Sequence, residues 1–269
     1  MKTYVINLGR RKDRLALMSA QLNGMSLSFE RVPAIDSVAV ENAWLAQYFA
    51  ARGPLGTIPK GDQCCSLSHR CAWATFLASY EPYAMFLEDD VLLDPGATDL
   101  LRDSGWLPPN VDLLKLEHFG PESQRVLLGE PVQVATGRYI APIHSRHTGA
   151  AAYILSRNAA KLLMSLDAKW PVPVDHMLFN ANVSGIAALL RPHQLMPTIA
   201  RQHDGFGASD IAPSRRPLKT LSFSYAKREL VRAYYETRLL PLQIAKVLIG
   251  RAQLIAVRGR PLRNRSPDC

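Results

Sequence analysis

Residues 83–93 read Tyr-Ala-Met-Phe-Leu-Glu-Asp-Asp-Val-Leu-Leu, and this stretch sets the first expectations for the chain. The apolar run before the acidic triplet is typical of a buried strand. Three adjacent carboxylates repel one another, so they need a compensating charge at the end of a strand. Their oxygens suit Mg²⁺ or Mn²⁺, especially an ion shared with a diphosphate. An acidic turn that caps the next element is the alternative.

Segments on both sides of this stretch alternate between strand and helix patterns. This alternation predicts an α/β sandwich with a central, mostly parallel sheet. In such sheets ligands bind beyond the carboxyl ends of the strands, which is where residues 88–90 fall. Strands are expected over 3–8, 29–35, 83–87, 111–116, 150–155 and 186–190, a hairpin over 126–142, and helices over 10–22, 40–52, 62–80, 156–166 and 174–183.

The length and composition are those of an ordinary globular protein. The chain has 269 residues, 48% of them hydrophobic and 20% charged, which fits one large domain or one domain with an appendage. No run of 18 apolar residues predicts a membrane-spanning helix. The basic residues near the N-terminus follow the short apolar run, which is the wrong order for a secretory signal. These features lead us to expect a cytoplasmic protein.

The basic excess lies in the last 55 residues. Residues 215–269 hold 13 Lys and Arg against 3 Asp and Glu, whereas residues 1–214 hold 19 against 20. We therefore expect a catalytic domain over 1–212 and a basic, amphipathic, helical tail over 213–269. A cationic helical segment over 221–259 fits an anionic membrane surface, and a helix packed on the catalytic domain is the alternative. The segment carries no nucleic-acid reader motif, so no nucleic-acid partner is expected.

Three of the four cysteines lie within eight residues. A zinc interpretation would use Cys65, His69 and Cys71, but no second Cys or His pair has conventional spacing. Adjacent Cys64 and Cys65 also make a poor disulfide framework. Buried free thiols in a helix are the favoured interpretation, and Cys269 stands apart near the C-terminus.

Four segments occur in a characteristic order along the chain. They are Val-Ile-Asn-Leu at 5–8 followed by Arg-Arg-Lys-Asp-Arg at 10–14, Gly-Asp-Gln-Cys-Cys-Ser-Leu-Ser-His at 61–69, Phe-Leu-Glu-Asp-Asp at 86–90, and Gly-Ala-Ala-Ala-Tyr-Ile-Leu-Ser-Arg-Asn-Ala-Ala at 149–160 with Pro-Val-Asp at 173–175. In this order and spacing the chain resembles glycosyltransferase family 25 over roughly residues 1–210. That family includes bacterial lipopolysaccharide and lipooligosaccharide core galactosyltransferases. Asp62 and Cys64 depart from its usual Glu and Gly.

The resemblance implies a GT-A-like fold, a UDP-sugar donor and inversion at the anomeric carbon. A divalent ion, Mn²⁺ or Mg²⁺, would stabilise the charge that develops on the leaving diphosphate. In this scheme Asp90 binds the metal. Glu88 lies in the outer shell of the metal or on the donor ribose, and Asp89 takes either part.

An inverting transfer also needs a general base for the acceptor hydroxyl. Asp175 is the first candidate because it follows Pro173 at the start of a predicted short helix. An N-cap carboxylate is an equally weighted alternative for Asp175. Asp112 and Glu117, which flank another predicted strand, are weaker candidates for the base.

Further polar residues are candidates for holding the donor. Asn7 follows the first strand, and Arg11 and Arg14 lie one turn apart, so they could hold phosphate or uracil edges, or form a solvated helix face. His69 either lines the site or is a core histidine. His203 is a candidate ligand of the metal or diphosphate within a polar, glycine-containing loop. That loop could close over the donor or simply lead to the basic tail.

These expectations combine into one functional interpretation. The chain would be an inverting glycosyltransferase that moves a hexose, with galactose first in line, from a UDP-sugar to a lipid-linked lipopolysaccharide or lipooligosaccharide core. It would work at the inner face of the cytoplasmic membrane as a peripheral protein. A transferase for another glycan or a protein acceptor is one alternative. A non-catalytic sugar-nucleotide or surface-binding protein is another.

Overall fold

The computed structural model describes residues 1–118, 125–203 and 223–259, and within these the side chains of residues 223–228 are left out. The strands are β1 (Lys2–Asn7), β2 (Glu30–Pro33), β3 (Tyr83–Glu88), β4 (Val91–Leu93), β5 (Leu113–Lys115), β6 (Glu117–His118), β7 (Arg125–Gly129), β8 (Val132–Ala135), β9 (Arg138–Pro142), β10 (Ala152–Ser156), β11 (His193–Met196), β12 (Ala200–Gln202) and β13 (Ala252–Ala256). The helices are α1 (Lys12–Gly24), α2 (Asn42–Leu45), α3 (Lys60–Leu77), α4 (Thr98–Arg102), α5 (Arg157–Met164), α6 (Val174–Phe179), α7 (Gly185–Leu190), α8 (Phe223–Thr237) and α9 (Leu240–Leu248), with a 3₁₀ turn η1 (Pro95–Ala97).

An eight-stranded sheet forms the centre of the molecule, in the order β2-β1-β3-β10-β5-β11-β9-β8. The expected α/β sandwich is present, but the expectation of a mostly parallel sheet is wrong. Only β1–β2, β1–β3 and β5–β11 pair in parallel, while the other four neighbouring pairs are antiparallel. The strand direction changes because β10 enters between β3 and β5 from the opposite end of the sheet.

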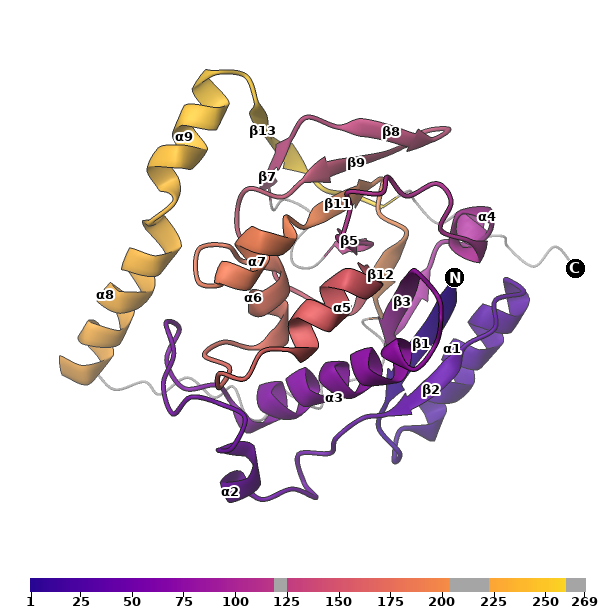
Figure 1. The fold of residues 1–269 in the computed structure, drawn as a ribbon, viewed down its shortest axis with the longest axis horizontal. Coiled ribbons are helices and arrows are strands. Elements are labelled where there is room, and N and C mark those ends of the chain that lie inside the picture. Colours follow the sequence, from indigo (N-terminus) through magenta and orange to yellow (C-terminus); the bar gives the residue numbers. More distant parts are fainter. Residues whose placement is uncertain (119–124, 204–222, 260–269) are drawn as a thin grey trace, which may run out of the picture.

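Both faces of the sheet are buried, because successive side chains along each strand alternate between two cores. Tyr4, Phe86 and Tyr153 point to the core beneath α3, α5, α6 and α7. Val5 and Met85 point to the opposite core, which contains residues of α1 and α4. The apolar run of β3 is therefore continuous, as expected for a strand covered on both sides. Figure 1 shows α3, α5, α6 and α7 in front of the sheet.

Two expected elements differ in the structure. Residues 186–190 form helix α7, not a strand, because Ser184 caps the segment by accepting a hydrogen bond from the Ala187 amide and the alanines favour a helix. Within 40–52 only α2 is α-helical. The chain then turns to pair with a distant segment, since the Ala50 amide donates to the Trp170 carbonyl at 3.0 Å.

The C-terminal segment forms two helices and a strand. Helix was expected through residue 259, but 252–256 form β13, which pairs antiparallel with β7 on the catalytic body.

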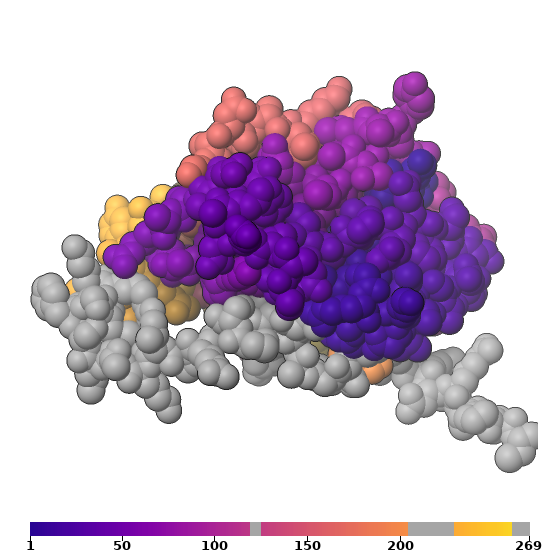
Figure 2. Space-filling view, turned by 90° about the horizontal axis from the view of Figure 1, so that it is seen from below, coloured from indigo at the N-terminus to yellow at the C-terminus, as the bar shows by residue number. Residues whose placement is uncertain are grey.

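Of the expected hairpin over 126–142, β8 and β9 pair as predicted. The expected boundary at 212/213 lies outside the described residues. Figure 1 shows α8 and α9 along one side of the sheet. In Figure 2 the N-terminal part covers most of the face seen from below, with C-terminal residues at its left.

Side chains of α9 lie on the surface, and none of them is buried. Among the described helices, none combines the length and the apolar character needed to cross a membrane. The large apolar side chains that α8, α9 and the segment after them expose are Leu230, Val231, Tyr234, Leu240, Leu242, Ile244, Val247, Leu248, Ile249 and Leu254. We call this set the C-terminal apolar face.

Candidate functional site

Polar residues from distant segments meet at one edge of the sheet. The parallel pairing of β1 with β3 sets Ile6 opposite Glu88, so Asn7 and the acidic triplet leave the sheet side by side. The antiparallel β10 begins at this same edge, and the Glu88 amide donates to the Ala151 carbonyl at 2.8 Å. We call this region the donor edge, because the sequence predicts that a nucleotide-sugar donor binds beyond the carboxyl ends of the strands.

Asp89 is held by two of the residues that were expected to contact the donor. The Asn7 amide nitrogen donates to Asp89 Oδ2 at 2.7 Å, and Arg14 lies 3.1 Å from Asp89 Oδ1. All three side chains are buried. Burial raises the pKa of Asp89, although Asn7 and Arg14 oppose the rise. Asn7 and Arg14 therefore secure the acidic triplet from the side of α1.

Asp90 is the least compensated carboxylate of the triplet. Arg14 lies 3.5 Å from its Oδ2, while its buried Oδ1 has no hydrogen-bond partner among the described residues. Burial, followed by the charge of Glu88, raises the pKa of Asp90 to about 7. The His203 amide donates to the Asp90 carbonyl at 2.7 Å, so the backbone of His203 lies beside the triplet. The rest of the expected lid, 204–207, lies outside the described residues.

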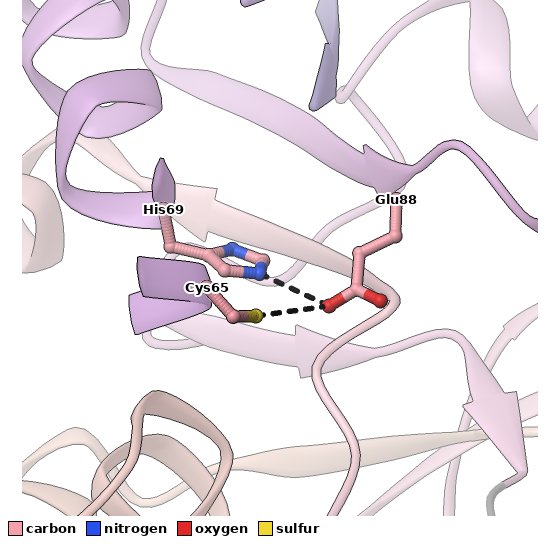
Figure 3. Close-up of side chains that lie close together, drawn as sticks. All are labelled: Cys65, His69 and Glu88. Atoms are coloured by element: carbon pink, nitrogen blue, oxygen red, sulfur yellow. Dashed lines mark hydrogen bonds and ion pairs between the residues drawn. The ribbon is translucent and has the colours of Figure 1, made fainter. Parts of the chain in front are cut away.

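Glu88 lies against two side chains of α3 (Figure 3). His69 Nε2 is 3.3 Å from Glu88 Oε1, and the Cys65 thiol is 3.6 Å from the same oxygen. Burial alone would raise the pKa of Glu88, but the contact with His69 outweighs it and the pKa is lowered. Burial, followed by the charge of Glu88, raises the pKa of the Cys65 thiol well above its usual value. The zinc interpretation of the sequence joined Cys65 to His69 and Cys71, and the favoured interpretation was a buried free thiol, so the contact of Cys65 with Glu88 was not foreseen.

A chain of hydrogen bonds sets the orientation of His69, which is fully buried. Trp73 Nε1 donates to the Tyr153 hydroxyl at 2.8 Å, and that hydroxyl lies 2.9 Å from His69 Nδ1. The hydroxyl accepts from the indole, so its own proton points to Nδ1, which leaves Nε2–H to donate to Glu88. His69 thus has the position of a core histidine and still contacts the acidic triplet.

A buried ion pair at the same edge was not expected. Lys115 Nζ lies 3.1 Å from Glu117 Oε1 and also donates to the Gly149 carbonyl, and both side chains of the pair are fully buried. Glu117 Oε1 accepts from the Ala151 amide at 2.7 Å, whereas its Oε2 has no partner among the described residues. Burial lowers the pKa of Lys115. The available signal was a Lys and a Glu alternating with leucines over 113–117.

Asp175 reaches the same region from α6. Its Oδ2 accepts from the Gly149 amide at 3.4 Å and its Oδ1 accepts from the His176 amide at 2.8 Å. The N-cap of α6 is Pro173, so the alternative role of Asp175 as an N-cap carboxylate does not apply. Asp112, a weaker candidate for the base, accepts a hydrogen bond from Ser156 at the far end of β10.

Arg11 is set apart from the acidic triplet. Its guanidinium pairs with Asp13 at 2.8 Å, and the Asp13 side chain is largely exposed. The hydrogen bond from Arg11 lowers the pKa of Asp13 to about 2. The Arg11 carbonyl accepts from the Asn7 side chain at 3.0 Å, so the backbone of Arg11 helps to orient Asn7.

A cavity of about 200 Å³ lies beside α6. Its cationic lining consists of Arg146 and Arg232, each paired with Glu236 at 2.8 and 3.1 Å. His176, which follows Asp175 in the chain, also lines it, together with apolar and backbone groups of the 55–59 loop. Two arginines on a concave surface can bind a polar, acidic ligand.

The sequence matches glycosyltransferase family 25, described as LPS biosynthesis protein, over residues 1–178. It is 30% identical over 196 residues to the lacto-N-neotetraose biosynthesis glycosyltransferase LgtB of Neisseria gonorrhoeae, and the alignment covers 67% of each chain. It is 27% identical over 186 residues to the lipooligosaccharide biosynthesis protein lic2B of Haemophilus influenzae, and the alignment covers 66% of this chain and 69% of that protein.

Among solved structures, the fold is similar to a glycosyltransferase involved in the glycosylation of the major capsid of PBCV-1. The TM-score is 0.40 and the sequence identity 11%, with 79% of this chain and 96% of that chain covered.

Proposed function

The chain belongs to glycosyltransferase family 25, and from this premise we propose that it transfers a hexose from a UDP-sugar to a lipopolysaccharide or lipooligosaccharide acceptor with inversion. Galactose is the first donor sugar to test. One observation carries the proposal: Asp90, with a buried carboxylate oxygen that has no partner among the described residues, lies beside two further carboxylates at the carboxyl end of a central strand. Such an edge suits a cation and the diphosphate that the cation would accompany.

The donor set fits a hard divalent cation. In the part of the chain that the structure describes, one Asp90 oxygen has no partner, and burial and Glu88 raise the pKa of Asp90 to about 7. A bound cation would therefore relieve an existing electrostatic cost. Carboxylate oxygens are the ligands that Mg²⁺ and Mn²⁺ prefer. We assign Asp90 to the metal, with Glu88 and Asp89 supporting it, and His203 as a further candidate ligand. Bound there, the ion would neutralise charge on the leaving diphosphate.

The protein groups around the triplet have separate tasks. Asn7 and Arg14 orient Asp89 through contacts of 2.7 and 3.1 Å, which keeps the triplet in place when the donor binds. The Arg14 charge offsets part of the repulsion within the triplet and adds positive potential beside the diphosphate. Arg11 extends this positive potential toward solvent. His69 holds Glu88 ionised and fixes its rotamer.

Asp175 is the proposed general base. Its carboxylate is oriented by the Gly149 and His176 amides, and neither contact neutralises it. It would accept the proton of the acceptor hydroxyl as the oxygen attacks the anomeric carbon. The neighbouring cavity lined by Arg146 and Arg232 would hold the acceptor, and its arginines suit acidic groups on a core oligosaccharide.

The C-terminal apolar face supports a peripheral membrane location. Most of its leucines and its tyrosine lie on α8 and α9, which also carry Arg232 and Lys246, and Arg238 lies in the turn between the two helices. This combination suits the boundary between acyl chains and anionic head groups. We propose that α8 and α9 hold the enzyme at the inner face of the cytoplasmic membrane, where a lipid-linked acceptor is presented.

The direct test is donor turnover by the purified chain. UDP-galactose, UDP-glucose and UDP-N-acetylglucosamine would each be incubated with and without Mn²⁺, with UDP binding read in the same samples. We expect Mn²⁺-dependent hydrolysis of one donor and its loss in Asp90→Ala. Absence of both turnover and Mn²⁺-dependent UDP binding would reject the transferase proposal in favour of a non-catalytic binding protein.

A further inference from the structure

Cys65, His69 and Glu88 form a cluster whose chemistry differs from that of the acidic triplet. One potential ligand atom from each lies within 4.8 Å of the other two. Cys65 and His69 are four residues apart on α3, so they project from the same helical face. Glu88 approaches them from the end of β3 (Figure 3). A thiol, an imidazole and a carboxylate thus converge from two rigid elements.

We propose that these three residues bind Zn²⁺. For a tetrahedral zinc ion with ordinary bond lengths, the histidine nitrogen and carboxylate oxygen would be about 3.4 Å apart, and the thiolate sulfur and that oxygen about 3.6 Å apart. The observed separations are 3.3 Å and 3.6 Å. These two separations already match those of a bound ion, and the Cys65 sulfur and the His69 nitrogen lie within 4.8 Å of each other.

The ligand types select the metal. A thiolate and an imidazole favour Zn²⁺ over Mg²⁺ and Mn²⁺, which prefer all-oxygen sites such as the one at Asp90. Three protein ligands leave a fourth position for water or another ligand. The Glu88 side chain is 23% exposed, which provides an entry path from solvent, while His69 is inaccessible.

Neighbouring groups fit the protonation changes that binding requires. The Cys65 thiol would release its proton to solvent, and the His69 proton would move from Nε2 to Nδ1. At Nδ1 it would meet the Tyr153 hydroxyl oxygen, 2.9 Å away, which can accept it once the hydroxyl's own proton rotates away from Nδ1. Trp73 anchors that hydroxyl from the other side, so the imidazole would keep its orientation.

Zn²⁺ bound to this cluster would engage the Glu88 carboxylate, which lies at the donor edge. If the chain has the proposed function, Zn²⁺ would inhibit transfer by competing for that carboxylate. Only this consequence rests on the proposed function. The binding itself stands on the ligand geometry. The deciding experiment therefore measures the metal and not turnover.

The test uses the full chain, treated with chelator and reduced, and titrated with Co²⁺ as a spectroscopic substitute for Zn²⁺. We expect a near-ultraviolet thiolate-to-cobalt charge-transfer band that one equivalent of Zn²⁺ removes and Mg²⁺ does not. Cys65→Ser should lose the band and bind Zn²⁺ about 100-fold more weakly. Cys71→Ser is the matched control, because Cys71 is an exposed thiol on the same helix, and it should keep both.

A second measurement needs no variant at Cys65. Alkylation of the wild-type protein, mapped by mass spectrometry, should show that one equivalent of Zn²⁺ protects Cys65 and leaves Cys71 reactive. Three results would overturn the proposal: no charge-transfer band in the wild type, the same band in Cys65→Ser, or equal protection of both thiols. In each case the cluster would be only a hydrogen-bonded support for Glu88.

Discussion

The donor edge and the C-terminal helices reverse the usual distribution of side chains in opposite ways. At the donor edge, Lys115, Glu117 and Asp89 are buried inside the sheet layers. On α8 and α9, leucines and a tyrosine face outward. Burying charge costs free energy, and exposing a large apolar patch invites association. Each region therefore forgoes stability in the isolated protein, which suggests that each is shaped for a ligand.

The two regions are also held by different forces. The donor edge is built on strands with cores on both faces, so its polar groups rest on a rigid framework. In the part that the structure describes, the C-terminal helices contact the body through Tyr235, which packs against one core, and through several polar groups. Glu236 pairs with Arg146, Arg238 donates to the Ala181 carbonyl, and Lys246 contacts His144. We therefore expect substitutions at the donor edge to affect folding and catalysis, and those on the helices to affect location.

The largest effect is expected from breaking the buried ion pair. Lys115→Met leaves Glu117 charged and uncompensated, and should lower the free energy of unfolding by about 3–5 kcal/mol in urea titrations. Adding Glu117→Gln should recover part of the loss. Arg102→Met removes one side of an exposed pair with Asp99 and should cost less than about 1 kcal/mol. Equal losses of unfolding free energy from the buried and exposed pairs would contradict the prediction that burial makes the Lys115–Glu117 pair costly to break.

Removal of the carboxylate that we propose as the metal ligand should affect catalysis rather than folding. Asp90→Asn keeps the size of the side chain but removes its charge, and should reduce kcat/KM by about 10²–10³-fold. The control is Asp99→Asn, because the Asp99 carboxylate is 96% exposed on α4 and should be silent. Steady-state kinetics with the preferred donor would decide, and an unimpaired Asp90→Asn enzyme would refute the assignment.

Charge placed on the C-terminal apolar face should abolish membrane binding without affecting the fold. Leu242 and Leu248 are 57% and 80% exposed. Replacing both by Glu should weaken binding to anionic vesicles by about 10²-fold, or about 2–3 kcal/mol, while Tm stays unchanged. Val38→Glu is the control, because Val38 is an exposed apolar residue far from these helices in the chain. Unchanged vesicle sedimentation would contradict the membrane proposal.

The smallest effect concerns pH at the contact between α9 and the body. Burial, followed by the Lys246 charge, lowers the pKa of His144 to about 4. Since the unfolded imidazole titrates near pH 6.5, the unfolded state takes up the proton first as the pH falls. The contribution of His144 is thus fully present above about pH 6.5 and is lost toward about pH 4.

After allowance for its partial exposure, His144 should contribute about 1–2 kcal/mol of this pH dependence. The comparison is between the wild type and His144→Gln, each unfolded in urea at about pH 7.5 and about pH 4.5. The variant should lose less stability on acidification. Identical losses in both proteins would show that His144 does not sense pH at this contact.

Parts of the donor edge were predictable because they depend on local pattern. The apolar run of β3 placed the triplet at a strand end, and parallel pairing with β1 brought Asn7 to it. The two cores of the sheet and the cap at Ser156 follow from similarly local signals. The pattern of β3 and the cap at Ser156 rest on residues close together in the sequence, whereas the pairing of β1 with β3 follows from the α/β arrangement expected for the chain.

Other parts depended on long-range contacts. The direction of β10 depends on how its connections cross the sheet, so the mixed sheet was not foreseen. Lys115 and Glu117 alternate with leucines, a pattern that also describes a strand with one exposed face. The contact of Cys65 with Glu88 arises only when α3 packs over β3. The short apolar run 186–190 fits either a helix or a strand until its cap is recognised.

The late position of β11 and β12 has a consequence for how the protein is made. Residues 193–202 supply the strands that pair with β5 and β9, and with β4 and β6. During synthesis, the acidic triplet and Asp175 emerge before the strands that complete their sheets. Until then the nascent chain presents open strand edges. The ribosome thus releases the proposed catalytic residues ahead of their framework, and chaperone dependence should be greatest in the interval before residue 202 emerges.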